Sequence, residues 1–358
     1  MDEAAILDAL RRVTDPDLED DIVSLGLVND IEVEADDRVH VSLALGTPYA
    51  PSESTIADRV RDVLRSEGLD PSLSARYDPH QDKADAPLAS VKNIIAVSSG
   101  KGGVGKSTIS VNVASALAKR GARVGLFDAD VYGPDIPRMM GSTERPQATT
   151  DEQLIPPEQY GIKLMSMAFL IGEDDPIIWR GPMVHKVLTQ LWDDVQWGEL
   201  DYMVIDLPPG TGDTQLTMLQ TIPITGAVVV TTPQQVALDD AQRGLEMFGR
   251  HDTVVLGIVE NMGPFTCPDC GGEHDLFGSG GGEALAEQSN VPFLGSVPLD
   301  PAIRSGGDAG SPIALDEDSE TGTALREIGD RIANMVGIVN RRRIQEEHET
   351  GKPSQSTN

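Results

Sequence analysis

The sequence predicts an α/β protein in which a large domain with a doubly wound, mostly parallel sheet follows a small α+β domain. Three observations support this fold class. From Asn93 onward, apolar runs typical of buried strands alternate with helical segments, and each run ends in a loop of polar or glycine residues. Residues 1–80 differ, because two helical segments flank one hairpin there. A polar stretch between the two regions, residues 78–90, is typical of a linker.

The small domain is expected to contain three elements. Apolar residues at helical spacing predict a first helix, alternation around Asp36 and Asp37 predicts a hairpin, and a second helical pattern ends at Gly68. These elements occupy residues 3–13, 27–46 and 52–68. The resulting boundaries are residues 1–80 for the small domain and 81–92 for the linker.

The large domain is expected over residues 93–340. Its strands are expected at residues 93–100, 122–130, 202–210, 226–233, 253–261 and 293–300. In a sheet of this kind ligands bind beyond the carboxyl ends of the strands, so functional residues are expected in the loops that follow these runs. An amphipathic helix comes next, and the polar residues 341–358 are expected to form a disordered tail.

The net charge of the chain limits the classes of partner that it is expected to bind, and its hydropathy indicates its expected location in the cell. The formal net charge is -30 at pH 7, and the acidic residues are spread along the whole chain. Such a surface repels nucleic acid and anionic membranes, so neither is an expected partner. The acidity and the preference for Arg resemble those of salt-adapted, halophilic proteins. Because the sequence has neither a basic leader nor a run of about eighteen apolar residues, we expect a cytoplasmic protein.

A phosphate-binding loop is the most specific motif. The segment SSGKGGVGKSTIS, residues 98–110, lies between an apolar strand and a helical segment. Part of it also matches G-x-G-x-x-G, and on that pattern alone a nicotinamide enzyme stays open. Gly105, Lys106 and Ser107 complete G-x-x-x-x-G-K-S/T, in which backbone N–H groups and a lysine hold phosphates and a hydroxyl binds Mg²⁺. The large domain is therefore predicted to be a P-loop domain that binds a nucleoside triphosphate and Mg²⁺.

Carboxylates after two other strands are expected to complete this site. Asp206 ends an apolar strand, as a Walker B acid does, and Gly210 is placed to give its N–H to a γ-phosphate. A helix cap is the alternative role of Asp206, although two prolines follow it closely and disfavour an immediate helix. Asp128 and Asp130 end another strand, where we expect them to meet Mg²⁺ and the attacking water, unless one of them only caps the loop.

Several motifs in order give the chain a resemblance to a known family. They are the phosphate-binding loop with its additional Lys101, FDADVYGPDIP, WRGPM, DLPPGTGD, TTPQQVALDD, ENM and the Cys-x-x-Cys loop. Together they closely resemble the Mrp/ApbC family of iron–sulfur cluster carrier ATPases, which is related to the MinD and ParA ATPases. The resemblance covers residues 90–339.

The small domain has a resemblance of its own. TDPDLEDDIVSLGLVNDI, residues 14–31, is similar to the iron–sulfur assembly domain that some members of this family carry at the N-terminus. That domain often has a cysteine after its Thr-Pro turn, whereas this chain has Ala50. We therefore expect docking, rather than cluster ligation, from the small domain.

The family resemblance implies roles for individual residues. It implies that Lys101 crosses a face-to-face dimer to the phosphates of the partner, unless it is a solvated loop lysine, and that Lys106 and Ser107 act within their own chain. It also implies that Asn261 and the turn Pro298–Asp300 border the adenine. The expected catalytic residues are Lys101, Lys106, Asp130 and Asp206. The expected ATP and Mg²⁺ site comprises Ser99, Gly100, Lys101, Gly102, Gly103, Val104, Gly105, Lys106, Ser107, Thr108, Asp128, Gly210, Asn261, Pro298 and Asp300.

Cys267 and Cys270 are the only cysteines in the chain, and they lie in one glycine-rich loop. An iron–sulfur cluster or a structural zinc needs about four ligands, of which this pair supplies two. A twofold dimer would bring two such loops together and complete a four-thiolate site. Zinc with His274 as a third ligand is the alternative within one chain. A thioredoxin-like redox pair is disfavoured because the loop does not open a helix.

These observations predict a homodimeric, Mg²⁺-dependent ATPase that holds a labile iron–sulfur cluster, expected to be 4Fe–4S, between its subunits and passes it to apo iron–sulfur proteins. ATP is expected to switch the dimer between geometries that hold or release the cluster. The alternative is a positioning or partition ATPase like MinD with structural zinc at Cys267 and Cys270. It would use a membrane helix, and residues 326–343 are amphipathic with a basic end. We expect this helix to pack on the sheet instead.

Overall fold

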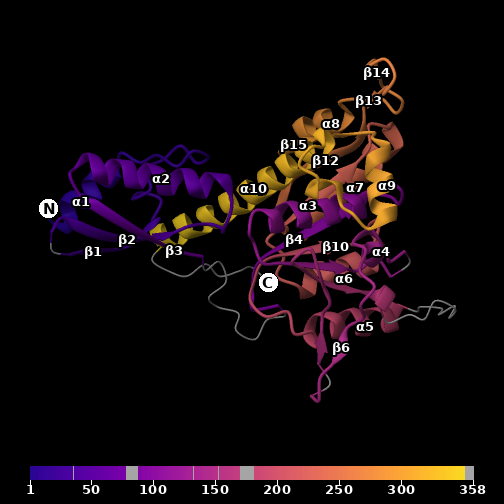
Figure 1. The fold of residues 1–358 in the computed structure, drawn as a ribbon, viewed down its shortest axis with the longest axis horizontal. Coiled ribbons are helices and arrows are strands. Elements are labelled where there is room, and N and C mark those ends of the chain that lie inside the picture. The colour runs from indigo at the N-terminus through magenta and orange to yellow at the C-terminus, as the bar shows by residue number, and fades with distance from the viewer. Residues whose placement is uncertain (35, 78–87, 132, 152, 170–180, 351–358) are drawn as a thin grey trace. The chain divides into compact units, whose positions relative to one another are not determined.

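The computed structural model describes every residue except 35, 78–87, 132, 152, 170–180 and 351–358 (Figure 1). It divides into two compact units. Unit 1 comprises Met1–Asp82 together with Ala333–Asn358, and unit 2 comprises Lys83–Ile332. Most of the predicted linker and the first two residues of WRGPM lie outside the described residues. Strand β4 begins at Val91, within the segment predicted as linker.

The centre of unit 2 is an eight-stranded sheet in the order β15-β12-β11-β4-β10-β5-β9-β8. Neighbouring strands are parallel except β8, which is antiparallel to β9. The strands are β4 (Val91–Ser99), β5 (Val124–Asp128), β8 (Glu158–Gln159), β9 (Ile162–Ser166), β10 (Leu200–Asp206), β11 (Gly226–Thr231), β12 (Val255–Gly263) and β15 (Phe293–Pro298). The predicted fold class is confirmed, and each predicted strand is present. Strands β8 and β9 were not predicted.

Helices cover both faces of this sheet (Figure 1). Helices α5, α6, α7 and α8 share one apolar core with strand residues such as Ile94 and Ala96 of β4. Ile95 and Val97 alternate with those residues and therefore face the opposite side, where α3 packs on β4, β5 and β10. The helices are α3 (Lys106–Lys119), α4 (Ile136–Met139), α5 (Gly181–Asp193), α6 (Asp213–Thr221), α7 (Gln235–Arg250), α8 (Gly281–Ser289) and α9 (Pro301–Ala309).

Two small hairpins and two short 3-10 turns complete unit 2. One hairpin pairs β6 (Gln147–Ala148) with β7 (Leu154–Ile155), and the other pairs β13 (Phe265–Thr266) with β14 (Glu273–His274). The turns are η1 (Met167–Phe169) and η2 (Ile313–Leu315). The β13–β14 hairpin contains both cysteines and directly follows β12.

Unit 1 has a three-stranded sheet in the order β1-β2-β3. Strands β1 (Val28–Val33) and β2 (Arg38–Ala44) form the predicted antiparallel hairpin. Strand β3 (Asp70–Arg76) pairs parallel to β2 and was not predicted. Helices α1 (Glu3–Leu10) and α2 (Pro51–Ser66) contribute apolar residues to the same core as the sheet. A chain segment this short buries little apolar surface, so the additional helix from the C-terminal part of the chain is important to unit 1.

That additional helix corrects the predicted disordered tail. Helix α10 (Glu320–Thr350) continues through most of residues 341–358, and only 351–358 lie outside the described residues. Its side chain at Arg341 is fully buried in unit 1, where it forms ion pairs with carboxylates of the N-terminal segment. Unit 2 also ends at Ile332, eight residues before the predicted end of the large domain at residue 340. The prediction failed because those ion-pair partners are distant in the sequence.

Candidate nucleotide site and cysteine hairpin

The loop between β4 and α3 has the conformation that its glycines permit. Gly103 and Gly105 have φ values of 81° and 87°, in the left-handed region that favours glycine. A Cβ at Gly100 would lie 2.2 Å from the carbonyl carbon of Asp240, so α7 approaches the loop too closely for any other residue. Helix α3 then begins at Lys106. The loop is thereby held at the amino end of a helix, where backbone N–H groups favour a phosphate.

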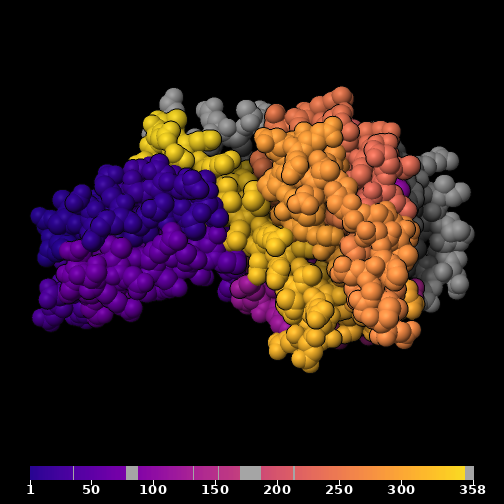
Figure 2. Space-filling model, turned by 90° about the horizontal axis from the view of Figure 1, so that it is seen from above, coloured from indigo at the N-terminus to yellow at the C-terminus, as the bar shows by residue number. Residues whose placement is uncertain are grey.

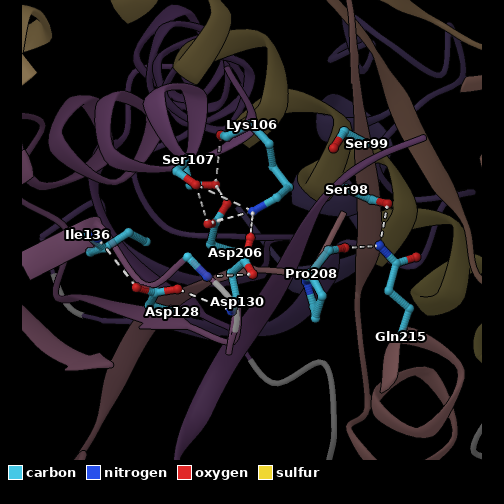
Figure 3. A network of polar contacts seen from close by, with 12 residues as sticks. Ser98, Ser99, Lys106, Ser107, Asp128, Asp130, Ile136, Asp206, Pro208 and Gln215 are labelled. Atoms are coloured by element: carbon cyan, nitrogen blue, oxygen red, sulfur yellow. Dashed lines mark hydrogen bonds and ion pairs between the residues drawn. The ribbon is translucent and has the colours of Figure 1, made fainter. Parts of the chain in front are cut away.

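Lys106 is brought together with Asp206, which ends β10 (Figure 3). The Nζ of Lys106 lies 2.7 Å from Oδ2 of Asp206, and both side chains are buried. Ser107 Oγ donates to the same carboxylate oxygen at 2.6 Å, and Ser110 Oγ donates to Oδ1 at 2.6 Å. Asp206 does not cap a helix, because α6 begins only at Asp213. The predicted Walker B acid thus faces the lysine and serine of the phosphate-binding loop.

The two acids after β5 differ in their surroundings. Asp128 accepts hydrogen bonds from Ser166 Oγ at 2.8 Å and from the backbone N–H of Asp130 at 3.1 Å. Burial and the charge of neighbouring Asp206 raise the pKa of Asp128 well above its ordinary value. Asp130 Oδ2 lies 3.8 Å from Lys106 Nζ. Asp128 therefore holds the loop, which is one of the two roles foreseen for this pair, and Asp130 faces the phosphate-binding lysine.

A cleft of about 310 Å³ opens beside the phosphate-binding loop. It contains the three residues expected near adenine, Asn261, Pro298 and Asp300. Asn261 donates from Nδ2 to the carbonyl of Val104 at 2.8 Å, which ties β12 to the loop. Asp300 caps α9 by accepting from the N–H of Ala302 at 2.8 Å. The rest of the lining is Gly105, Thr108, Asp135, Arg138, Met139, Met262, Leu299, Ile303, Arg304, Gly307 and Asp308. A partly apolar cleft next to a phosphate site suits a base and its ribose.

Lys101 and Gly210 are placed differently from the other predicted residues. The Lys101 side chain is half-buried and makes no hydrogen bond or ion pair with the part of the chain that the structure describes. The N–H of Gly210 donates to the carbonyl of Ser99 at 2.9 Å. That bond must break before the Gly210 N–H can bind a γ-phosphate. Neither residue therefore joins the contacts around Asp206.

Three polar residues of this region were not foreseen. Ser110 lies one helical turn after Ser107, and that spacing on one face of α3 was an available signal. Ser166 ends β9, a strand that was missed altogether. Gln215 of α6 is buried and donates from Nε2 to the carbonyl of Pro208 and, at 3.3 Å, to Ser98 Oγ (Figure 3). It links the segment after Asp206 to β4.

The donor atoms around Asp206 suit a hard cation. Ser107 Oγ and the carboxylates of Asp206 and Asp130 surround one buried ammonium group. Mg²⁺ binds such oxygen donors, usually through one or two carboxylates together with nucleotide phosphates. These three residues are the ones that would hold Mg²⁺ with a bound nucleotide, and the ion would there supply positive charge to the phosphates.

The cysteines lie in a tight turn at the tip of the β13–β14 hairpin. The N–H of Cys267 donates to the carbonyl of Gly272 at 2.9 Å, and the N–H of Gly271 donates back to the carbonyl of Cys267 at 2.9 Å. Gly271 has a φ of 69°, which closes the turn. Cys270 is exposed, and the orange part of unit 2, which includes this hairpin, forms part of the surface in Figure 2. Both thiols can therefore meet a ligand from outside the chain.

The hairpin activates one thiol but does not complete a metal site. The backbone N–H groups of Asp269 and Cys270, together with the Cys270 side chain, lower the pKa of Cys267, which favours the thiolate that binds metals. Among the described residues, no group of three or more His, Cys, Asp or Glu side chains could hold a metal ion. His274 therefore does not form the three-ligand site considered above with the two cysteines.

The structure also bears on the membrane question. In the part of the chain that the structure describes, no helix is both long and apolar enough to cross a bilayer.

Comparisons with family models match both units. Residues 90–333 match the model of the NUBPL iron-transfer P-loop NTPase, and residues 3–70 match the model of the iron–sulfur cluster assembly protein. The matched ranges contain the phosphate-binding loop, the cysteine hairpin and most of the N-terminal segment of unit 1.

Individual relatives and solved structures agree with these matches. The chain is 46% identical over 345 residues to the iron–sulfur cluster carrier protein of Synechocystis sp., which covers 93% of this chain and 98% of that protein. It is 36% identical, with a TM-score of 0.58, to a nucleotide-binding protein of Archaeoglobus fulgidus in complex with ADP, covering 69% of this chain and 96% of the other. The cell division ATPase MinD of Pyrococcus furiosus shares the fold, with 23% identity, a TM-score of 0.51, and coverage of 68% and 98%.

Proposed function

The chain belongs to the NUBPL iron-transfer P-loop NTPase family, and on that premise we propose that it is an ATP-dependent carrier that binds a labile iron–sulfur cluster and transfers it to apoproteins. The resemblance to iron–sulfur carrier ATPases inferred from the motifs is confirmed by this membership. Relatives in other organisms bear the name iron–sulfur cluster carrier protein, which supports the same cargo here.

The buried pair Lys106 and Asp206 supports Mg²⁺-dependent ATP hydrolysis as the driving reaction. The lysine is held by the carboxylate of Asp206 at 2.7 Å. A phosphate chain carries more negative charge and would draw the ammonium group from Asp206, which frees that carboxylate and Ser107 to hold Mg²⁺. The lysine is thus positioned close to its place of action, and little conformational entropy is lost when nucleotide binds.

The cysteine hairpin is the single observation that supports the cargo best. It presents two thiols at the surface, one with a lowered pKa, and no third ligand from the described residues of the chain. Because clusters are usually held by four thiolates, we propose that two copies of the hairpin meet in a homodimer and share one 4Fe–4S cluster. A pair of ligands from each subunit makes the cluster easier to release, because separation of the subunits removes half of its ligands.

Helix α10 argues against the positioning ATPase considered above. The apolar face expected to enter a membrane includes Val336 and Val339, and both side chains are buried in unit 1. A membrane-binding helix instead needs a free apolar face. The same residues therefore have a structural role that accounts for the amphipathic pattern.

Anaerobic purification tests the proposal directly. We expect iron and sulfide in the purified or reconstituted protein, absorbance in the visible range, and activation of an apo iron–sulfur enzyme when the two proteins are mixed. Stoichiometric zinc without visible absorbance would contradict the carrier function. Omission of Mg²⁺ should abolish ATP hydrolysis, and excess chelator added before ATP is the matched control.

A further inference from the structure

The carboxyl end of β12 contacts both the nucleotide cleft and the cysteine hairpin. Asn261 donates to the phosphate-binding loop at the carbonyl of Val104, and it lines the cleft together with Met262. The adjacent residue, Glu260, has a different set of partners on the hairpin side. Two consecutive residues of one strand thus contact the phosphate-binding loop and the segment that follows the cysteine hairpin, and the proposed function requires coupling between these two regions.

Glu260 holds the start of α8, the helix that follows the cysteine hairpin. Its side chain is 1% exposed. Oε2 accepts from the N–H of Gly282 at 2.7 Å, while Oε1 accepts from the N–H of Gly280 at 3.2 Å and from Ser296 Oγ at 3.2 Å. Gly280 and Gly282 lie at the start of α8, six and eight residues after the hairpin ends at His274, so the carboxylate faces the positive end of that helix. The beginning of the hairpin follows Gly263 on the same strand. The chain is therefore held at the end of β12 on both sides of the hairpin, before it at Gly263 and after it at Gly280 and Gly282.

A bulge separates Glu260 from the start of the hairpin. Glu260 pairs with Ser296 and Gly263 pairs with Pro298, so the β12–β15 register shifts between these two positions. Met262 lies within the shift and has a φ of 58°, in the left-handed region. Such a conformation is strained for a non-glycine residue, and bulges re-aim neighbouring side chains. This strained backbone segment lines the nucleotide cleft.

We infer that Glu260 is a positioning residue that couples nucleotide occupancy to the cysteine hairpin. Nucleotide in the cleft contacts Asn261 and Met262, the bulge changes its conformation, and Glu260 transmits that change to the N–H groups at the start of α8, the helix that follows the hairpin. The consequence is a shift in the position and exposure of Cys267 and Cys270. The inference deepens the proposed function, because it assigns to the Glu260 carboxylate the step by which ATP changes how the two cysteines bind the cluster.

Thiol alkylation of the metal-free, reduced protein tests the coupling without any cluster. Because the chain has only 2 cysteines, iodoacetamide reports on the hairpin alone. The rate is measured with no nucleotide, with ADP and Mg²⁺, and with a non-hydrolysable ATP analogue and Mg²⁺. We expect nucleotide to change the wild-type rate about 5-fold or more, the lower range of typical couplings between sites.

Glu260→Ala should remove the nucleotide effect and leave nucleotide binding intact. We expect its two rates, with and without nucleotide, to agree within about 2-fold, and its affinity for a fluorescent ADP analogue to stay within about 3-fold of wild type. A purely structural role would change both alkylation rates by the same factor and leave their ratio untouched. Glu283→Gln is the matched control, since Glu283 is an exposed acid in the first turn of the same helix, and it should keep the wild-type ratio.

Conservative variants keep the test decisive if Glu260→Ala folds poorly. Glu260→Gln retains one acceptor, and Ser296→Ala removes one donor at an exposed position, so both should reduce the ratio to between the wild-type and alanine values. A wild-type ratio near one, or an undiminished ratio in the Glu260 variants, would overturn the coupling. Neither result depends on whether the protein carries an iron–sulfur cluster. The iron content of the wild-type protein tests that part of the proposed function separately.

Discussion

Lys106 Nζ lies 2.7 Å from Asp206 Oδ2, and the two side chains are 6% and 0% exposed. Neither charge is stable alone in such surroundings, because an unpaired buried charge costs several kcal/mol. The pair is therefore both a stabilising contact of the buried site and the source of the two groups that nucleotide and Mg²⁺ need. Substitutions here must be interpreted with both roles in view.

Substitutions of the two lysines in the phosphate-binding loop are expected to have different effects on nucleotide binding and on turnover. Lys106→Ala should abolish nucleotide binding or hydrolysis, because it removes the phosphate cation and leaves Asp206 unpaired. Lys101→Ala should spare binding but lower turnover by a factor on the order of 10²–10³, if Lys101 stabilises the transition state across a dimer. Nucleotide affinity and ATP turnover separate the two effects. Wild-type turnover by the Lys101 variant would remove this residue from the mechanism.

The cysteines are expected to act as one unit. Cys270→Ser should keep ATP binding, because the nucleotide cleft does not include the hairpin, yet lose the cluster and its transfer. The single variants Cys267→Ser and Cys270→Ser should be nearly as defective as the double variant, since all four thiolates are needed in the shared site. Reconstituted wild-type protein should hold about four irons per dimer. Transfer at the wild-type rate by Cys270→Ser would refute the carrier mechanism.

Unit 1 is expected to depend on Arg341. Its guanidinium is fully buried and pairs with Asp15, Asp17 and Glu53. Arg341→Met should destabilise unit 1 by about 3–5 kcal/mol, because it leaves buried carboxylates unpaired. Hydrogen exchange of β1–β3 amides measures the effect. Arg342→Met is the control, since Arg342 is exposed and its loss should change exchange by less than about 0.5 kcal/mol.

Glu53 is expected to make the stability of unit 1 depend on pH. Burial raises its pKa to about 7, against the opposing effect of Arg341. Below its unfolded pKa, near 4.5, the carboxyl is protonated in both states and the contribution to stability is complete. Between that value and about 7 the unfolded state alone loses the proton, so stability should fall by up to about 1.4 kcal/mol per pH unit.

Urea unfolding between pH 4 and 8 checks this sign. Glu53→Gln should flatten the decline, while Glu32→Gln, which changes an exposed acid, should keep it. A wild-type stability that rises over the interval relative to Glu53→Gln would contradict the raised pKa.

Salt is expected to stabilise the whole chain. With a net charge of -30, its carboxylates repel one another in dilute buffer, and about 1 M salt screens such repulsion within about 3 Å. The melting temperature should rise by about 5 °C or more between dilute buffer and 1 M KCl. Sorbitol at the same osmolality is the control for effects other than screening. An unchanged melting temperature would argue against salt adaptation.

The sequence predicted those parts of the fold that leave a local pattern. Buried parallel strands such as β10 are continuous apolar runs, and the phosphate-binding loop has a motif because glycines and one lysine must be adjacent in the chain. Strand β3, DPSLSAR, has a mostly polar sequence and was missed because it is stabilised by pairing with β2, which no local pattern indicates. Residues 341–350 were predicted to be disordered because the partners of Arg341 that hold this part of α10 are distant in the sequence.

The candidate site likewise contains some residues that a local motif indicates and others that no local pattern indicates. Lys106, Ser107 and Asp206 were found by motif, and the structure brings them within hydrogen-bonding distance. Ser166 and Glu260 act through partners far along the chain or through backbone N–H groups, and no spacing in the sequence indicates such contacts. Whether the Gly210 N–H is free also depends on backbone geometry, which a motif does not contain.

The division of unit 1 between Met1–Asp82 and Ala333–Asn358 has a consequence for biosynthesis. The ribosome makes the N-terminal segment first, but about 250 residues must follow before Arg341 emerges to neutralise Asp15, Asp17 and Glu53. At about 5–20 residues per second the nascent segment waits on the order of 10–50 s. During that interval the N-terminal segment carries unpaired carboxylates and an incomplete apolar core. It is therefore the part of the nascent chain that most needs a chaperone. The first unit to be translated is the last that can finish folding.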